Sequence, residues 1–213
     1  MRFGWRPARG LGYTCDMSAL RPDYHSIVTA FRQGVLTIFL VLTTAFAAFG
    51  QNAARDAALD EAFARLAAPQ GEGWRIAEAD ILREWSRSGS AAMDVLLRRG
   101  EQALDRGDIP AAIGHLTALT DHAPDFAAGW HTRAAAFALS GQVGPAISDL
   151  ARTLELEPRH FAALTQLGAL LEDIGDPKAA QAAYRESLRI HPHQQEAIDG
   201  LARLERGDQG TDI

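Results

Sequence analysis

Two breaker residues recur in the second half of this chain at an interval of 34 residues. The prolines of the series are Pro124, Pro158 and Pro192, and the glycines are Gly107, Gly141 and Gly175. A proline and a glycine that each recur three times at the same spacing indicate a tandem array of one structural unit. A single unit cannot bury its own apolar face, so neighbouring units are expected to stack around a continuous core.

Each unit is predicted to hold two helices. The units begin at Met93, Ala127 and Phe161, and in each one the glycine separates an apolar first segment from a second segment that ends in proline. A glycine suits the left-handed residue that ends a helix. Asp176 is predicted to cap the second helix of the last unit, which Pro177 opens.

Small side chains at two positions of the unit are expected to let its two helices approach closely. The eighth and twentieth positions hold Gly100, Ala134, Gly168, Ala112, Ala146 and Ala180. Larger apolar residues at the fourth and twenty-fourth positions fill the space around this crossing: Leu96, Trp130, Leu164, Leu116, Leu150 and Tyr184. Arg133, at a seventh position, either pairs with Asp149 on the partner helix or extends to solvent.

This pattern resembles the tetratricopeptide repeat family over about residues 93–194. The resemblance implies an all-α fold, a right-handed α-solenoid made of three repeats and a capping helix within residues 93–206. It also implies a scaffold that binds a protein partner and is not an enzyme. Binding a helix or an extended segment follows from the curved shape that stacked repeats create.

The resemblance places the partner on the concave groove, which the family lines with five positions of each first helix. The groove residues carried onto this chain are Asp94, Leu97, Glu101, Leu104, Asp105, His131, Ala135, Leu139, Thr165, Glu172 and Asp173. No Lys, Arg or Asn occupies these positions, so the groove is not expected to clamp a C-terminal carboxylate. An apolar or basic peptide segment fits its acidic ends and apolar middle better.

Two segments flank the array. Residues 51–92 are predicted to form a degenerate helix pair, either a worn fourth repeat or an N-terminal cap, because Leu59, Phe63 and Leu66 recur at helical spacing. Trp74, Ala77, Ile81 and Trp85 likewise share one face of a second helix. At the other end, residues 207–213 are expected to be a disordered tail.

An uncharged apolar run covers Val35–Phe49 and follows Arg32. A basic flank, a run of this length and small residues near its end are typical of a secretory signal peptide. Residues 27–50 are therefore predicted to be a signal peptide or a single membrane anchor, with the repeats in the periplasm or on the outer side of the inner membrane. Residues 1–26 show no periodicity and are assigned no structure, and translation could start at Met17 or at a later non-Met codon.

Charge excludes one class of partner. The chain has a net charge of −6, and residues 1–50 carry five Arg and two Asp, so residues 51–213 carry 16 basic and 25 acidic groups, a net −9. An acidic body does not favour nucleic acid, which calls for a basic face. Nor does it favour anionic lipid, so contact with a membrane is expected only through the N-terminal segment.

Residues with catalytic or metal-binding chemistry are few. Cys15 is the only cysteine, and the histidines that stand closest in sequence are His191 with His193 and His115 with His122. No HExxH motif, serine elbow or phosphate-binding loop accompanies them, so no cofactor, metal site or catalytic residue is predicted. Two alternatives to the scaffold stay open: a histidine-based metal-binding protein or enzyme, and a membrane-anchored structural spacer.

Overall fold

The structure, a computed structural model, describes residues 55–68 and 71–210, and these residues contain helices and turns but no strand. A helical segment covers residues 55–66. It is followed by α2 (Gly73–Trp85), α3 (Ala91–Asp105), α4 (Ile109–His122), α5 (Ala127–Leu139), α6 (Val143–Leu156), α7 (Phe161–Asp173), α8 (Pro177–Ile190) and α9 (Gln195–Gly210). The predicted segments 1–26 and 27–50 lie outside the described residues. None of the helices within the described ranges has both the length and the apolar character needed to span a membrane.

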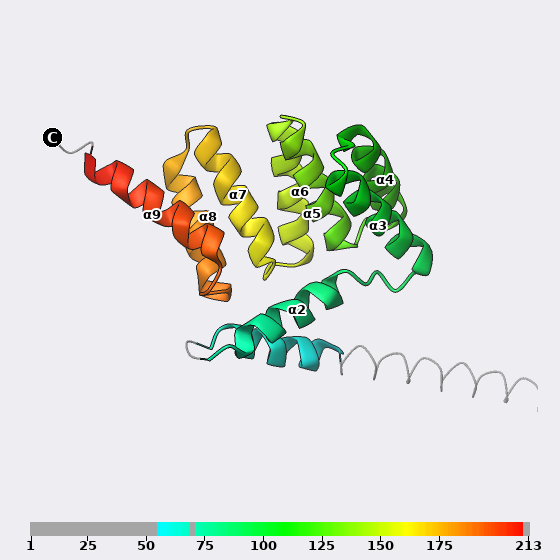
Figure 1. Ribbon diagram of the computed structural model, residues 1–213, viewed down its shortest axis with the longest axis horizontal. Coiled ribbons are helices and arrows are strands. Elements are labelled where there is room, and N and C mark those ends of the chain that lie inside the picture. The colour runs from blue at the N-terminus through cyan, green and yellow to red at the C-terminus, as the bar shows by residue number, and fades with distance from the viewer. Residues whose placement is uncertain (1–54, 69–70, 211–213) are drawn as a thin grey trace, which may run out of the picture. The chain divides into compact units, whose positions relative to one another are not determined.

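Helices α3 to α8 form three helix-turn-helix repeats that stack in chain order (Figure 1). Within each repeat the two helices pair, α3 with α4, α5 with α6 and α7 with α8. The first helices α3, α5 and α7 also contact one another from repeat to repeat. The all-α solenoid predicted from the 34-residue period is therefore confirmed.

The turns inside the repeats have the conformation that their glycines predict. Gly107, Gly141 and Gly175 have φ angles of +73°, +75° and +82°, in the left-handed region that favours glycine. The Asp176 carboxylate accepts a hydrogen bond from the Ala179 amide at 3.1 Å, as its predicted capping role requires. Asp108 caps α4 in the same way.

The helix crossings explain the small residues. A Cβ placed on Gly100 would lie 2.6 Å from the Leu116 side chain, and one on Gly168 would lie 2.7 Å from the Tyr184 ring. Ala112, Ala146 and Ala180, like Ala134, are fully buried. Only these small side chains allow the paired helices to approach this closely, so the predicted register of the repeats is correct.

The arginine at the seventh position of the second repeat pairs with an aspartate across the crossing. The Arg133 guanidinium donates to both carboxylate oxygens of Asp149, from Nε at 2.7 Å and from its terminal nitrogen at 2.8 Å. A third hydrogen bond, 2.7 Å long, reaches Thr120 Oγ1. Of the two expectations for Arg133, pairing with Asp149 is the one that the structure confirms.

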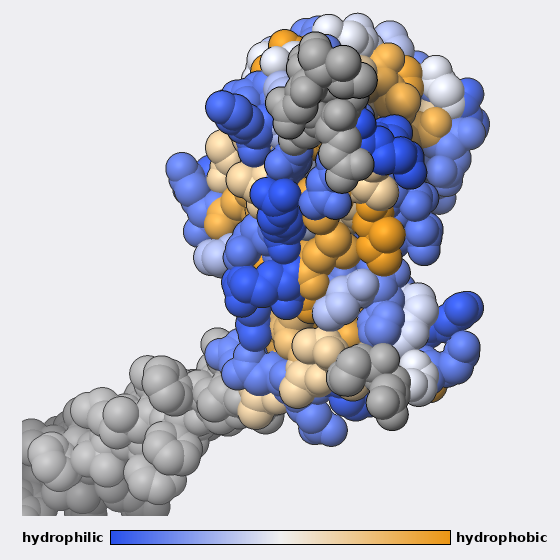
Figure 2. Space-filling model, turned by 90° about the vertical axis from the view of Figure 1, so that its left-hand side faces the viewer, coloured by the Kyte–Doolittle hydropathy of each residue, from blue (hydrophilic) through white to orange (hydrophobic). Residues whose placement is uncertain are grey.

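Helix α9 closes the C-terminal end of the array. Ala197 is fully buried against the cluster of Ala180 and Tyr184, while Leu201 and Leu204 pack on it from one side. Figure 2 looks at this end of the molecule, where hydrophilic residues in blue lie beside hydrophobic patches in orange. Such a mixed face allows the last repeat to end in water.

Helix α9 is longer than the sequence predicts. The disordered tail was predicted to begin at residue 207, but α9 continues to Gly210, so that prediction is wrong for residues 207–210. No proline follows the helix, and an isolated glycine lowers helix stability by only about 1 kcal/mol without ending the helix. Residues 211–213 lie outside the described residues.

The helical segment 55–66 and α2 form an N-terminal helix pair, here called the hairpin (residues 55–85). In Figure 1 it lies across the ends of the array helices. Its apolar face shares one core cluster with Phe161, Leu164 and Ile190, which belong to the third repeat. A fourth repeat or an N-terminal cap would instead pack against α3 and α4, whose core cluster contains no hairpin residue. The helix pair exists, but its predicted place at the start of the array is wrong.

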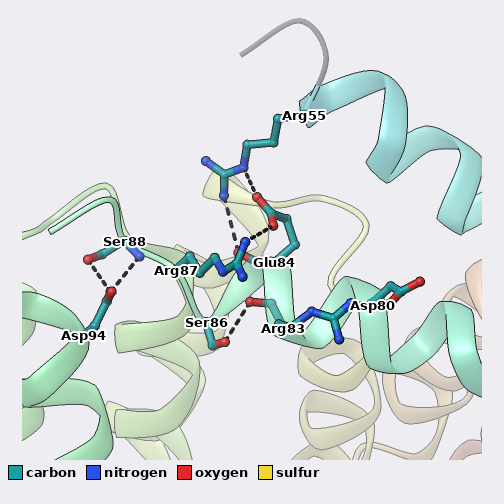
Figure 3. Close-up of polar contacts among 8 residues, drawn as sticks. All are labelled: Arg55, Asp80, Arg83, Glu84, Ser86, Arg87, Ser88 and Asp94. Atoms are coloured by element: carbon teal, nitrogen blue, oxygen red, sulfur yellow. Dashed lines mark hydrogen bonds and ion pairs between the residues drawn. The ribbon is translucent and has the colours of Figure 1, made fainter. Parts of the chain in front are cut away.

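Polar contacts fix the short link between the hairpin and the first repeat (Figure 3). The Asp94 carboxylate accepts hydrogen bonds from the Ser88 amide at 2.9 Å and the Ser88 hydroxyl at 2.6 Å. Inside the hairpin, Arg55 forms an ion pair with Glu84 that joins its two helices. The two helices of the hairpin are thus joined to each other, and the link that follows them is fixed to the beginning of α3.

Candidate functional site

The predicted groove residues lie on the first helices of the repeats, and part of this set reaches solvent. We call the solvent-facing part the first-helix surface: Glu101, Leu104, Asp105, Ala135, Leu139 and Asp173. Leu139 is 67% exposed, the largest value among the large apolar residues of the described chain. Glu101, Asp105 and Asp173 are exposed, while Leu104 and Ala135 are half-buried. Because α3, α5 and α7 contact one another, this surface extends over three repeats.

Three carboxylates of the first-helix surface, Glu101, Asp105 and Asp173, are exposed. Glu101 and Asp105 lie one helical turn apart on α3. Partial burial and, to a smaller extent, the nearby Asp105 charge raise the pKa of the Glu101 carboxyl, while Arg98 acts in the opposite direction. A carboxylate whose charged form is disfavoured in this way would gain from a cationic partner.

Other predicted groove residues are engaged inside the protein. Leu97 is 2% exposed and belongs to the core of the first repeat. Thr165 is buried, donates a 2.8 Å hydrogen bond to Gln194 Oε1 and lies 2.8 Å from Ser187 Oγ. Asp94 receives the hydrogen bonds from Ser88 described above. These three side chains are therefore not available as exposed ligand contacts.

Glu172 is also engaged, because α9 reaches back to it. Its carboxylate accepts hydrogen bonds from Arg203 at 3.0 and 3.2 Å and from the Tyr184 hydroxyl at 3.0 Å. The Arg203 hydrogen bonds, more than the one from Tyr184, lower the pKa of Glu172 against the opposing effect of burial. Burial and the same carboxylate raise the pKa of Tyr184 to about 12. Glu172 thus holds α9 in place.

His131, the remaining predicted groove residue, borders an aromatic interface between the hairpin and the array through its contact with His160. Its ring centroid lies 4.4 Å from that of His160. The Trp85 indole stacks on the other histidine, His160, with centroids 4.2 Å apart and planes 14° apart. Trp85 also lies 5.3 Å from Phe161. Repeat spacing alone did not reveal His160, which stands just before α7 and was not among the predicted site residues.

A second aromatic group lies at the other end of α2. Trp74 stacks on His193, with centroids 4.9 Å apart and planes 15° apart, and lies 5.7 Å from His191. His191 in turn meets the Phe161 ring edge-on at 4.8 Å. Trp74 and Trp85, which were predicted to share one face of a helix, both pack against the core cluster that contains Phe161.

Polar contacts surround this aromatic interface. Arg159 forms a 2.7 Å ion pair with Asp60 of the hairpin and lies over the Phe63 ring at 4.1 Å. His193 Nε2 lies 2.9 Å from the Ala68 carbonyl oxygen and donates to it. His191 Nε2 lies 3.4 Å from Glu78 Oε1, while His191 Nδ1 is buried and has no hydrogen-bond partner among the described residues.

Burial makes these histidines weak bases. It lowers the pKa of His131 to about 4. Burial, together with the neighbouring His131, lowers the pKa of His160 well below its usual value. The pKa of His191 is also lowered by burial, although Glu78 acts in the opposite direction. At neutral pH the interface therefore contains uncharged imidazoles.

The histidines do not form a metal centre in the part of the chain that is described. No group of three or more His, Cys, Asp or Glu side chains there could hold a metal ion. The ring centroids of His191 and His193 lie 6.3 Å apart, and both rings pack against Trp74. His115 and His122 lie on α4, outside this interface.

Comparisons with known proteins agree with the repeat architecture. A family model described as Tetratricopeptide repeat matches residues 161–204. A TPR repeat-containing protein of Rhizobium etli is 30% identical over 155 residues, which are 71% of this chain and 76% of that protein. Longer relatives also match, and the chain covers only 26% of the length of DnaJ homolog subfamily C member 3 from Rattus norvegicus.

Solved structures resemble the same part of the chain. The Sgt2 TPR domain from Aspergillus fumigatus has a TM-score of 0.54 and 26% identity over 56% of this chain and 81% of that one. The first TPR domain of Spaghetti (RPAP3), bound to the HSP90 peptide SRMEEVD, has a TM-score of 0.53 over 55% of this chain and 93% of that one. At 22% identity the second likeness concerns the fold alone.

Proposed function

Since this chain belongs to the tetratricopeptide repeat family, we propose that it is a non-catalytic scaffold that holds a peptide segment of a protein partner on its first-helix surface. Stacked repeats of this kind present one extended surface built from equivalent positions of successive units. The observation that carries the proposal is Leu139, a large apolar side chain that is 67% exposed on the first helix of the middle repeat.

The chemistry of the surface selects the class of ligand. Leu139, Leu104 and Ala135 offer apolar contact, while Glu101, Asp105 and Asp173 supply negative charge around it. The proposed ligand is an apolar segment that carries Lys or Arg. Apolar burial would supply most of its affinity, and the carboxylates would mainly set specificity and association rate. The Spaghetti domain binds a peptide with two glutamates and an aspartate, a charge pattern that this acidic surface would repel.

The site of action is a separate proposal. We infer that the apolar run Val35–Phe49 directs the repeats across a membrane, either as a cleaved signal or as an anchor. The scaffold would then work in the periplasm or on the outer side of the inner membrane. The net charge of −9 on residues 51–213 supports contact with a protein partner and disfavours direct contact with anionic lipid.

Two surface variants test the binding proposal. Leu139→Glu should abolish capture of the partner, because it removes the main apolar contact and adds a charge. Glu101→Lys should weaken capture of a basic ligand and reduce its dependence on salt. A matched control is Ala151→Glu, at an exposed position of the second helix α6. If both surface variants retain the partner at the wild-type level, the first-helix surface is not the binding site.

A further inference from the structure

We propose that the hairpin is an acid-released cover on the array: it stays docked while His131, His160 and His191 are uncharged, and acidification frees it to expose Phe161, Leu164 and Ile190. This inference concerns the hairpin alone and needs no partner. Its consequence, a second apolar surface next to the start of α7, adds to the proposed binding function without depending on it.

The array does not need the hairpin for its own core. The clusters inside the three repeats and under α9 contain no hairpin residue. The remaining core cluster is the one that joins the hairpin to the array. The hairpin contributes Ala62, Phe63, Leu66, Ala77 and Ile81 to it, and the array contributes Phe161, Leu164 and Ile190. Release of the hairpin would therefore open one interface and leave the repeats stacked.

Protonation of the neutral His160 ring to its cationic form would disrupt several contacts at once. Its Nδ1 accepts a 3.2 Å hydrogen bond from the Ala163 amide, which caps the first turn of α7. A proton on Nδ1 removes this acceptor and puts a cation at the positive end of the helix dipole. The ring is 3% exposed beneath Trp85, so a charge there is also separated from water.

The neighbours of His160 add to this effect. His131 packs against it at 4.4 Å, so the two rings cannot both be charged without repulsion. No hydrogen bond or ion pair brings a carboxylate to either ring among the described residues. Arg159 already places a permanent cation beside the interface, and the carboxylates near it, Asp60 and Glu157, are paired with that guanidinium. The indole face of Trp85 attracts a cation but does not replace the lost water or the lost helix cap.

His191 has a mixed environment. Burial and the nearby His193 disfavour its charged form, whereas Glu78 and Glu196 favour it. Glu78 lies on α2, so its attraction to a charged His191 would hold the hairpin in place and oppose release. Removal of the Glu78 charge should therefore make the hairpin easier to release with acid.

The direction of the pH effect follows from the lowered pKa values. A histidine that returns on release toward its ordinary value of 6.5 binds a proton more tightly in the open form. Docking is thus fully stable above about pH 6.5 and weakens as the pH falls toward the pKa of the docked form. The pKa of His131 is about 4 in the docked form, and any part of its burial that the hairpin supplies would be lost on release, which makes protonation favour the open form.

An acid titration of the full chain tests the proposal. The chain carries Trp5→Phe, which leaves Trp74 and Trp85 in the hairpin and Trp130 in the array. It is followed from pH 8 to pH 4 by tryptophan emission and by far-UV circular dichroism, and a variant that also carries Trp130→Phe shows that the change comes from the hairpin indoles. We expect the emission to shift to longer wavelength with a midpoint between pH 4 and pH 6.5. The helical signal of the array should remain.

Four variants assign the transition. His131→Phe keeps a ring that cannot be charged, and His160→Asn keeps a capping acceptor that cannot be charged. Each should move the midpoint to lower pH by at least about half a unit. Glu78→Gln should move it to higher pH, and the control His122→Asn, at an exposed position on α4, should leave it unchanged. The proposal is overturned if no emission change occurs above pH 4, if the change coincides with loss of all helical signal, or if the His131 and His160 variants titrate like the wild type.

Discussion

Arg133 of α5 and Asp149 of α6 form a two-bond ion pair across the helix crossing of the middle repeat, with donor–acceptor distances of 2.7 and 2.8 Å. Their side chains are only 13% and 6% exposed. The Arg133 guanidinium also lies over the Trp130 ring at 4.7 Å. A charged pair thus occupies a largely buried helix crossing, where two ion-pair hydrogen bonds and a third hydrogen bond to Thr120 compensate for the loss of water.

Removal of one partner should be costly. We expect Asp149→Ala to lower the free energy of unfolding by about 3 kcal/mol, because it leaves the Arg133 charge buried and unpaired. In a double-mutant cycle with Arg133→Met, the double variant should lose less than the sum of the two single losses by at least about 1 kcal/mol. Asp121→Ala, at an exposed position on α4, is the control and should change stability by less than about 0.5 kcal/mol. Additive losses in urea unfolding would show that the pair is not coupled.

Two glycine substitutions test the packing of the repeats. Gly168→Ala places a methyl group 2.7 Å from the Tyr184 ring, so it should lower stability by about 1–3 kcal/mol. Gly114→Ala, inside α4, meets nothing within 4 Å. It should instead raise stability by about 0.5–1 kcal/mol, since alanine favours a helix. Thermal unfolding of the two variants in parallel measures the difference, and equal effects would mean that the crossing is looser than described.

The contact between α7 and α9 should depend on pH. The pKa of Glu172 is lowered, first by its hydrogen bonds from Arg203. The stability that this carboxylate supplies is therefore fully present above its ordinary pKa of about 4.5 and is lost as the pH falls through the lowered value. Glu172→Gln should reduce the loss of thermal stability between pH 7 and pH 3. A variant that loses as much stability as the wild type over this range would contradict the role of Glu172.

Because Glu172 holds α9 in place, a charge reversal at this position should affect the stability of the protein as well as any ligand binding. Glu172→Lys places two cations together, next to Tyr184, and should lower stability by about 1 kcal/mol through loosening of α9. Hydrogen exchange of residues 195–206 would report that loosening directly. Unchanged hydrogen exchange together with weaker partner binding would show that Glu172 contacts the ligand instead of holding α9 in place.

The features that recur with the repeat period could be predicted from the sequence. Gly107, Gly141 and Gly175 specify the turns, because each turn needs a residue with a positive φ angle. Gly168 and Ala146 specify the helix crossings, because each crossing has room only for a small side chain. Pairing of Arg133 with Asp149 was one of two alternatives that the sequence left open, because both residues were expected at one level of the same helix pair. These features are local, or repeat at fixed spacing, so they can be derived without coordinates.

Contacts outside the period could not be predicted in this way. The hairpin has an apolar face of the correct spacing, but periodicity does not say which surface that face will cover. Thr165 and Glu172 stand at groove positions of the family, yet Gln194 and Arg203 reach back to engage them. His160 was missed because histidine is not among the residues that usually cap a helix.

The export proposal has its own test. A reporter enzyme that is active only outside the cytoplasm, fused after Arg55, should be active if the apolar run Val35–Phe49 directs transfer across the membrane. Introduction of two arginines into that run is the control and should silence the reporter. An inactive reporter, with a cytoplasmic reporter active at the same junction, would reject both the signal and the anchor.

Site-specific photo-crosslinking tests the proposed scaffold function most directly. A photoreactive amino acid at Leu139 of the full chain would be compared, in cells, with the same group at Ala151 on α6. We expect a discrete crosslinked protein at position 139, none at position 151, and loss of the product at position 139 when Glu101→Lys is added. Equal crosslinking at both positions, or no product at position 139 in cells that express the folded chain, would contradict the proposed scaffold function.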